Sequence, residues 1–144
     1  MTEVSDFTLD EALGAEFARN AFNPCVGTLL LSQNERARVW FIRLEPGERI
    51  GFHRHVLDYF WTALTAGRAI SHINGGPPME AQYHAGQTRH LSFGPGEYML
   101  HDLHNVGDTP LLFVTVEHLE SANPPLPLPD SVKPRSLDAG MLAS

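Results

Sequence analysis

The chain has 144 residues, a formal net charge of −7 and a single cysteine, Cys25. This length suits one domain and is enough to bury a hydrophobic core. Its ten Lys and Arg residues are scattered, which argues against a nucleic-acid binder, because phosphate contacts need clustered positive charge. One cysteine excludes an internal disulfide framework and a cysteine-rich zinc site. The apolar runs are too short to cross a membrane and the first residues do not resemble a signal peptide, so we expect a cytoplasmic protein.

Residues 1–24 predict an N-terminal arm with a short amphipathic helix. Apolar residues recur at three- and four-residue spacing from Leu9 to Phe17, Asp10 stands near the start, and Asn23-Pro24 ends the pattern. We expect this arm to pack on the main domain rather than to bind a partner.

Residues 25–120 predict a single domain made of strands. Short segments rich in β-branched and aromatic residues alternate with Gly-, Pro- and Asn-containing turns, and no helical pattern lies between them. Such spacing predicts an antiparallel sandwich or barrel. The expected strands are 26–31, 38–44, 49–55, 57–64, 68–73, 79–84, 88–93, 97–101 and 111–119.

Residues 121–144 form a Pro-rich C-terminal extension. Its prolines favour an extended, polyproline-like segment without regular structure. We expect it to lie over the barrel surface or a neighbouring subunit; a ligand for an SH3-type domain is the less favoured alternative.

The unusual feature of the composition is its eight histidines, all of which lie between His53 and His118. His53 and His55 are separated by one residue on an expected strand, so their side chains point to the same face. Two imidazoles placed in this way can hold one metal ion.

Two segments of the chain resemble the motifs of the cupin superfamily. The first is Gly47, five residues, then His53-Arg54-His55, with Gly67 at the far end; the second is His101-Asp-Leu-His-Asn105. The resemblance implies an all-β fold, a double-stranded β-helix (cupin or jelly-roll) barrel. It also implies that His53, His55 and His101 bind a divalent transition metal (Fe, Ni, Zn, Mn or Cu).

This chain departs from the family at the glutamate that completes the first motif. The corresponding position falls on Tyr59 or on Phe60, with Asp58 adjacent. Three interpretations stay open. An open three-histidine site can bind a substrate directly at the metal. Tyr59 can hydrogen-bond a ligand or act as a general acid or base. Alternatively, the glutamate was lost together with the metal, which leaves a metal-free pocket or a plain structural barrel.

The other five histidines do not occupy the ligand positions of the two motifs. His104 is expected to be a turn residue and a poor ligand, and His90 to be solvated. His72 lies on the same side of its expected strand as Arg68, Ile70 and Asn74. Its side chain can therefore face either a cavity or solvent, and both alternatives stay open. His84 and His118 are expected at the surface.

These observations predict a small cupin-type metal-binding protein. It is either a metal-dependent enzyme, of the dioxygenase, isomerase or lyase kind, that acts on a small oxygen-rich molecule, or a non-enzymatic barrel that binds or senses a small ligand. In the enzyme, Tyr59 is the catalytic candidate beside the metal. The strand at 38–44 is apolar on both faces, which together with the family resemblance predicts a homodimer.

Overall fold

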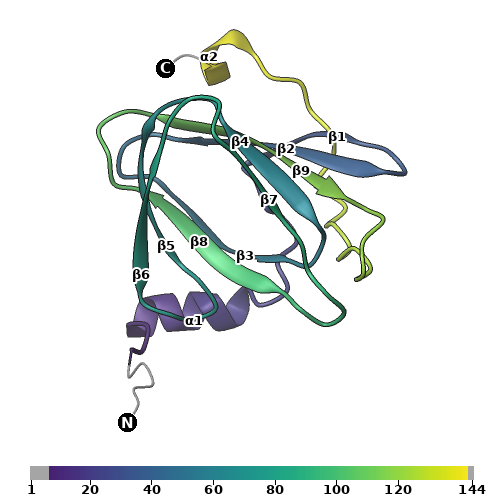
Figure 1. Ribbon diagram of the computed structural model, residues 1–144, viewed down its shortest axis with the longest axis horizontal. Helices are drawn as coiled ribbons and strands as arrows, with labels where there is room; N and C mark the ends of the chain where they lie inside the picture. Colours follow the sequence, from purple (N-terminus) through teal and green to yellow (C-terminus); the bar gives the residue numbers. More distant parts are fainter. Residues whose placement is uncertain (1–6, 143–144) are drawn as a thin grey trace.

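A computed structural model describes residues 7–142, in which nine strands and two short helices form a flattened barrel (Figure 1). The number of strands and their antiparallel type agree with the sequence prediction. The elements are α1 (Glu11–Arg19), β1 (Leu29–Gln33), β2 (Ala37–Leu44), β3 (Arg49–His55), β4 (Tyr59–Ala63), β5 (Gly67–His72), β6 (Pro78–Tyr83), β7 (Thr88–Leu91), β8 (Met99–Asn105), β9 (Leu111–His118) and α2 (Ala139–Leu142).

The strands form two antiparallel sheets that face each other. One has the order β1-β2-β9-β4-β7 and the other β3-β8-β5-β6. Because the chain repeatedly crosses between the two sheets, neighbours within a sheet are mostly distant in sequence, as in a jelly roll. The apolar core lies between the sheets and consists of Ile42, Leu44, Ala63, Ala69, Leu111 and Phe113. The predicted fold class is confirmed.

A β-bulge in β3 sets which of its side chains face the interior. Ile50 pairs with Leu103 and His53 pairs with His101, so three steps along β3 match two along β8. The extra residue reverses the alternation, and Ile50 and His53 therefore both line the cavity between the sheets. Phe52 points outward, where it packs under α1.

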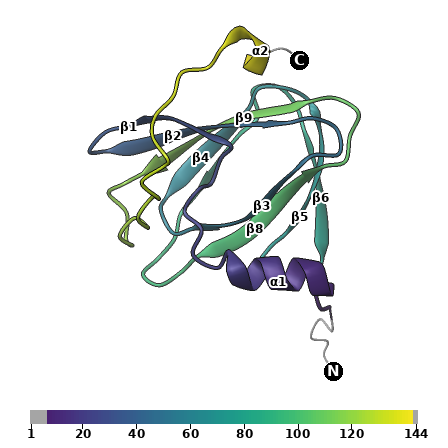
Figure 2. The same cartoon turned by 180° about the vertical axis from the view of Figure 1, so that it is seen from behind.

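Helix α1 covers the outer face of the four-stranded sheet (Figure 2). It begins at Asp10, whose side chain accepts a hydrogen bond from Leu13 N, as an N-cap does. Glu16 forms two hydrogen bonds of 2.8 and 2.9 Å with the guanidinium of Arg49, and its Oε2 also accepts the N–H of Phe52. A Cβ on Gly51 would lie 2.8 Å from this carboxylate, so a larger residue there would displace the Glu16 side chain from its place.

The segment after β9 runs back along β1 and ends above the outer face of the five-stranded sheet (Figures 1 and 2). Arg135 N donates to Leu30 O, and Leu128 and Val132 pack against a second apolar cluster that contains Trp40. At its end, Met141 O accepts a hydrogen bond from the side chain of Arg43 on β2. The extension therefore lies on the barrel of its own chain.

Two details differ from the sequence prediction. Strand β8 continues to Asn105, so His104 lies within a strand and is not a turn residue. Its pairing with Arg49 and Ile70 on both sides holds the segment extended, although its polar sequence looks like a loop. The Pro-rich extension also contains one helical turn, α2, beyond its last proline. None of the helices within residues 7–142 is long and apolar enough to cross a membrane.

Candidate metal centre

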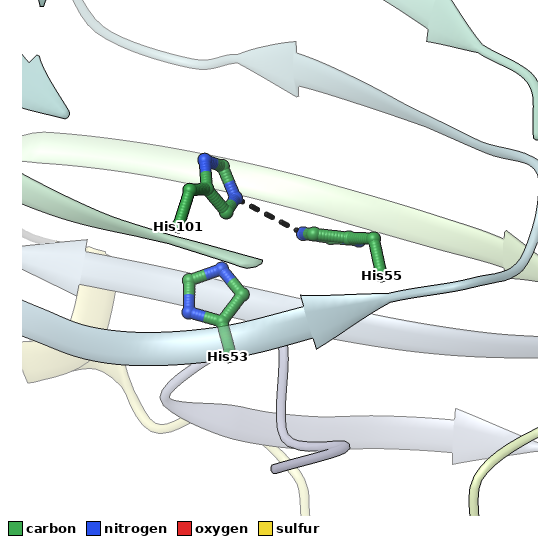
Figure 3. A group of neighbouring side chains, drawn as sticks. All are labelled: His53, His55 and His101. Carbon is green, nitrogen blue, oxygen red and sulfur yellow. Dashed lines mark hydrogen bonds between the residues drawn. The ribbon is translucent and has the colours of Figure 1, made fainter. Parts of the chain in front are cut away.

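Three histidines from two neighbouring strands converge inside the barrel (Figure 3). His53 and His55 come from β3, and His101 comes from β8, directly opposite His53. One ring nitrogen of each lies within 4.8 Å of the other two, and the Nε2 atoms of His55 and His101 are 3.1 Å apart. The His-x-His spacing and the second-motif histidine thus meet where the sequence pattern places them. Within residues 7–142, no carboxylate joins this group.

Hydrogen bonds at the far ring nitrogens orient two of the imidazoles. His53 Nδ1 lies 2.8 Å from Gly51 O, and since a carbonyl only accepts, Nδ1 carries the proton and Nε2 keeps its lone pair. Ser71 Oγ lies 3.4 Å from His101 Nδ1. Contacts of this kind fix the tautomer and the ring orientation of metal-binding histidines.

Burial keeps all three imidazoles neutral near pH 7. Loss of solvation lowers the pKa of His53 to about 4. Burial, with the neighbouring imidazoles adding repulsion, lowers the pKa of His55 and of His101 well below the usual value. A metal binds the unprotonated nitrogen, so the site needs no deprotonation at neutral pH.

The three imidazole nitrogens fit a transition metal, although the ring of one of them, His55, lacks a hydrogen bond at its other nitrogen. Two nitrogens on the same ion, each at 2.0–2.1 Å from it, lie about 3 Å apart, close to the separation of the His55 and His101 nitrogens. The Nδ1 atom of His55, however, is buried without a hydrogen-bond partner among the described residues. With metal on Nε2, the proton of His55 sits on that Nδ1, and an unpaired buried N–H costs about 1–3 kcal/mol.

The position of the missing glutamate is occupied by an aromatic ring. Tyr59 faces inward and stacks on His55, with ring centroids 4.0 Å apart and an angle of 11° between the planes. Burial raises the pKa of its phenol, which therefore stays protonated and can donate a proton or a hydrogen bond. Phe60 points to the outer face, against His90 and His118. Asp58 does not turn inward, because its Oδ1 accepts the N–H of Phe93.

The remaining histidines lie outside the cavity. His72, which could have faced the interior, is on the outer face, where its N–H and Nδ1 contact the fully buried carboxylate of Asp102. Its ring lies 6.4 Å from that of Phe52, which packs under α1. His90 is exposed, as predicted, and so are His84 and His118.

The histidines help to line a cavity of about 60 Å³ between the sheets. A cavity needs about 10–15 Å³ by this measure for each water, so it has room for about four waters or a ligand of a few heavy atoms. Most of its walls are apolar or aromatic, and Thr115 adds a hydroxyl. The remaining lining residues are Val26, Ile42, Ile50, Tyr59, Trp61, Tyr83, Leu103 and Phe113.

Sequence reasoning missed a buried carboxylate near this cavity. Glu117 on β9 is 3% exposed, pairs across the sheet with Tyr59, and its Oε1 accepts a hydrogen bond of 2.8 Å from Trp40 Nε1. Burial raises its pKa to about 7. The sequence did contain a signal for its burial: Glu117 alternates in step with Phe113 and Thr115 on the same strand, and both of these residues face inward.

Two facing antiparallel sheets define a double-stranded β-helix barrel, and three histidines turn into the space between the sheets. The fold is similar to that of a cupin domain from Bordetella pertussis Tohama I, with a TM-score of 0.55 and 28% identity over 67% of this chain and 95% of that one. On this fold and its two motifs, the chain belongs to the cupin superfamily.

Two further solved structures share the fold. One is an RmlC-like cupin family protein from Methanocaldococcus jannaschii (TM-score 0.51, 18% identity, 62% of this chain and 76% of that one). The other is an uncharacterized conserved protein with a double-stranded β-helix domain from Klebsiella pneumoniae (TM-score 0.51, 24% identity, 65% and 76%). No family model matches the chain, and no curated protein matches it significantly.

Proposed function

We propose that this cupin binds a divalent transition metal through His53, His55 and His101 and acts as a metal-dependent enzyme on a small, oxygen-rich organic molecule. The observation that carries the proposal is the convergence of three neutral imidazoles, two buried and one half-buried, whose ligand nitrogens lie within 4.8 Å of one another. Two of these imidazoles are buried and the third is half-buried, and burying polar groups is costly unless a partner uses them.

A metal bound here would act as a Lewis acid on the oxygen atoms of a bound substrate. The chain's own residues supply the rest of the chemistry. The cavity is small and mostly apolar, so it has room for only a few heavy atoms, which favours a compact substrate. Tyr59 holds the ring of His55 by stacking, and its protonated phenol is positioned as a hydrogen-bond donor or general acid rather than a base. Dioxygenase, isomerase and lyase reactions are all compatible with these roles.

A second candidate is a non-enzymatic barrel that binds a small ligand without metal. The observation that favours it is the contact of 3.1 Å between the Nε2 atoms of His55 and His101, since these two nitrogens can satisfy each other by one hydrogen bond. A homodimer and a cytoplasmic location stay predictions under either function.

Elemental analysis of purified protein separates the two candidates. After expression in medium with Fe, Ni, Zn, Mn and Cu, we expect about one metal per chain, and loss of that metal in the His53→Ala/His55→Ala variant. The matched control is His84→Ala/His90→Ala, which removes two exposed histidines and should leave the metal content unchanged. A wild-type protein free of metal would support the metal-free barrel, and metal retained without His53 and His55 would show that the ligands lie elsewhere.

The role of Tyr59 is tested on the metal-loaded protein. Oxygen consumption with small diketones and catechols identifies an oxygenase. With an active substrate found, Tyr59→Phe keeps the ring that stacks on His55 and removes only the hydroxyl. We expect unchanged metal content and a 10²-fold or greater loss of kcat if the phenol transfers a proton. Unchanged kcat would restrict Tyr59 to holding the ring of His55.

A further inference from the structure

A buried arginine lies at a second cleft, away from the histidines. Arg38 on β2 is only 6% exposed. Its Nε donates to Gln33 Oε1 at 3.2 Å. Within residues 7–142, its two terminal Nη groups have no hydrogen-bond acceptor, and no ion pair joins them to a carboxylate. A guanidinium is a fixed charge with a planar fork of donors. Since the Nη atoms are not among the fully buried polar atoms that lack a partner, the fork opens to the solvent of the adjoining cleft.

The carboxylate opposite Arg38 in the sheet pairing interacts with its charge at a distance but does not occupy the Nη groups. Glu117 lies opposite Arg38 across the β2–β9 pair. Its Oε1 is engaged by Trp40 Nε1, and it forms no ion pair with Arg38. The terminal donors of Arg38 are therefore available to an anion bound in the adjoining cleft.

Arg38 faces an open cleft of about 450 Å³ between β1 and the C-terminal extension. Leu30, Leu128 and Val132 form apolar walls, while Lys133 supplies a second cation and Asp130 a carboxylate. The extension is fixed here, because Arg135 N donates to Leu30 O. The cleft and the histidine cavity have no lining residue in common.

We propose that this cleft binds a small organic carboxylate, held by the two free Nη groups of Arg38, with its apolar part against Leu30 and Val132. The fork of a guanidinium matches the two oxygens of a carboxylate. Phosphate fits the same fork, but the negative charge of Asp130 in the lining repels a doubly charged anion. Phosphate also has no apolar part that could pack against the apolar walls. The C-terminal extension thus completes a ligand site instead of only covering the barrel.

Titration of the ¹⁵N-labelled full chain tests the proposal. Sodium butyrate is the probe, sodium phosphate is the competing anion, and sodium chloride at equal ionic strength is the control. We expect saturable shifts of the amide signals of residues 30–38 and 128–135 with butyrate, and weaker binding of phosphate. Arg36→Gln, at an exposed turn, should leave butyrate affinity unchanged, whereas Arg38→Gln should reduce it at least tenfold.

A second variant covers the case in which Arg38→Gln does not fold. Arg38→Lys keeps the charge but loses the fork, so its butyrate affinity should also fall about tenfold. The proposal is overturned if wild-type protein shows no saturable shifts, if phosphate binds more tightly than butyrate, or if Arg38→Lys binds butyrate as well as wild type does. Because the site is independent of the metal, a failure here leaves the proposed function untouched.

Discussion

The buried carboxylate of Glu117 should make the stability of this barrel fall as the pH rises through neutrality. Burial raises its pKa from 4.5 to about 7 in the folded state. Between these two values the folded chain holds a proton that the unfolded chain releases, so each pH unit in this window lowers the free energy of unfolding by up to about 1.4 kcal/mol. Between pH 5 and pH 8 the loss from this one residue sums to about 2.5 kcal/mol.

The substitution Glu117→Gln isolates this contribution. Glutamine has nearly the same shape, its carbonyl oxygen can still accept the hydrogen bond from Trp40 Nε1, and it does not titrate. The variant should therefore gain about 2.5 kcal/mol relative to wild type between pH 5 and pH 8. The buried histidines titrate in both proteins, so their contribution cancels in the difference.

Urea unfolding at pH 5, 6, 7 and 8 gives the measurement. Glu35→Gln, at an exposed turn, controls for the general effect of removing one negative charge from an acidic chain. If the difference in unfolding free energy between Glu117→Gln and wild type stays constant across this range, Glu117 does not hold its proton in the folded state and the reasoning fails.

Two further substitutions test what holds the site in place. Asn105 is fully buried; its Nδ2 donates to two backbone carbonyls and its Oδ1 accepts a backbone N–H. Asn105→Ala should lower the free energy of unfolding by about 3 kcal/mol in urea, because three hydrogen-bonded backbone groups lose their partner; a loss below about 1 kcal/mol would contradict this. Glu16→Gln weakens the paired hydrogen bonds to Arg49, and we expect a loss of about 1–2 kcal/mol by the same assay. An unchanged midpoint would show that α1 contributes nothing to the sheet.

The sequence alone was sufficient to predict the strands and the three histidines of the candidate site. Gly- and Pro-containing turns separate the strands clearly, and the alternation of side chains along a strand places His53 and His55 on one face without further information. His101 followed from the second motif, and its register opposite His53 could not be read from the chain, because pairing between β3 and β8 joins segments about fifty residues apart.

The sequence could not reveal the roles of residues whose partners come from several separate segments of the chain. Asp102 looks like part of a polar turn, yet it is fully buried because Arg49 and His72 come to it from two other strands. Glu117 looks like the polar end of a strand, yet Trp40 holds it inside. Local patterns report the periodicity of an element, whereas the burial of a charged group is decided by which distant groups surround it.

The outer face of the four-stranded sheet supports the histidines from behind. Glu16 of α1 accepts the N–H of Phe52, in the same bulge where Gly51 O receives the hydrogen bond of His53. On β8, His101 faces the cavity and the next residue, Asp102, faces outward to Arg49, which Glu16 also binds. One helix carboxylate is thus tied to both strands that carry the ligands. Since the geometry of a metal site depends on such supporting contacts, the N-terminal helix would help to position the proposed ligands, although it contributes no ligand itself.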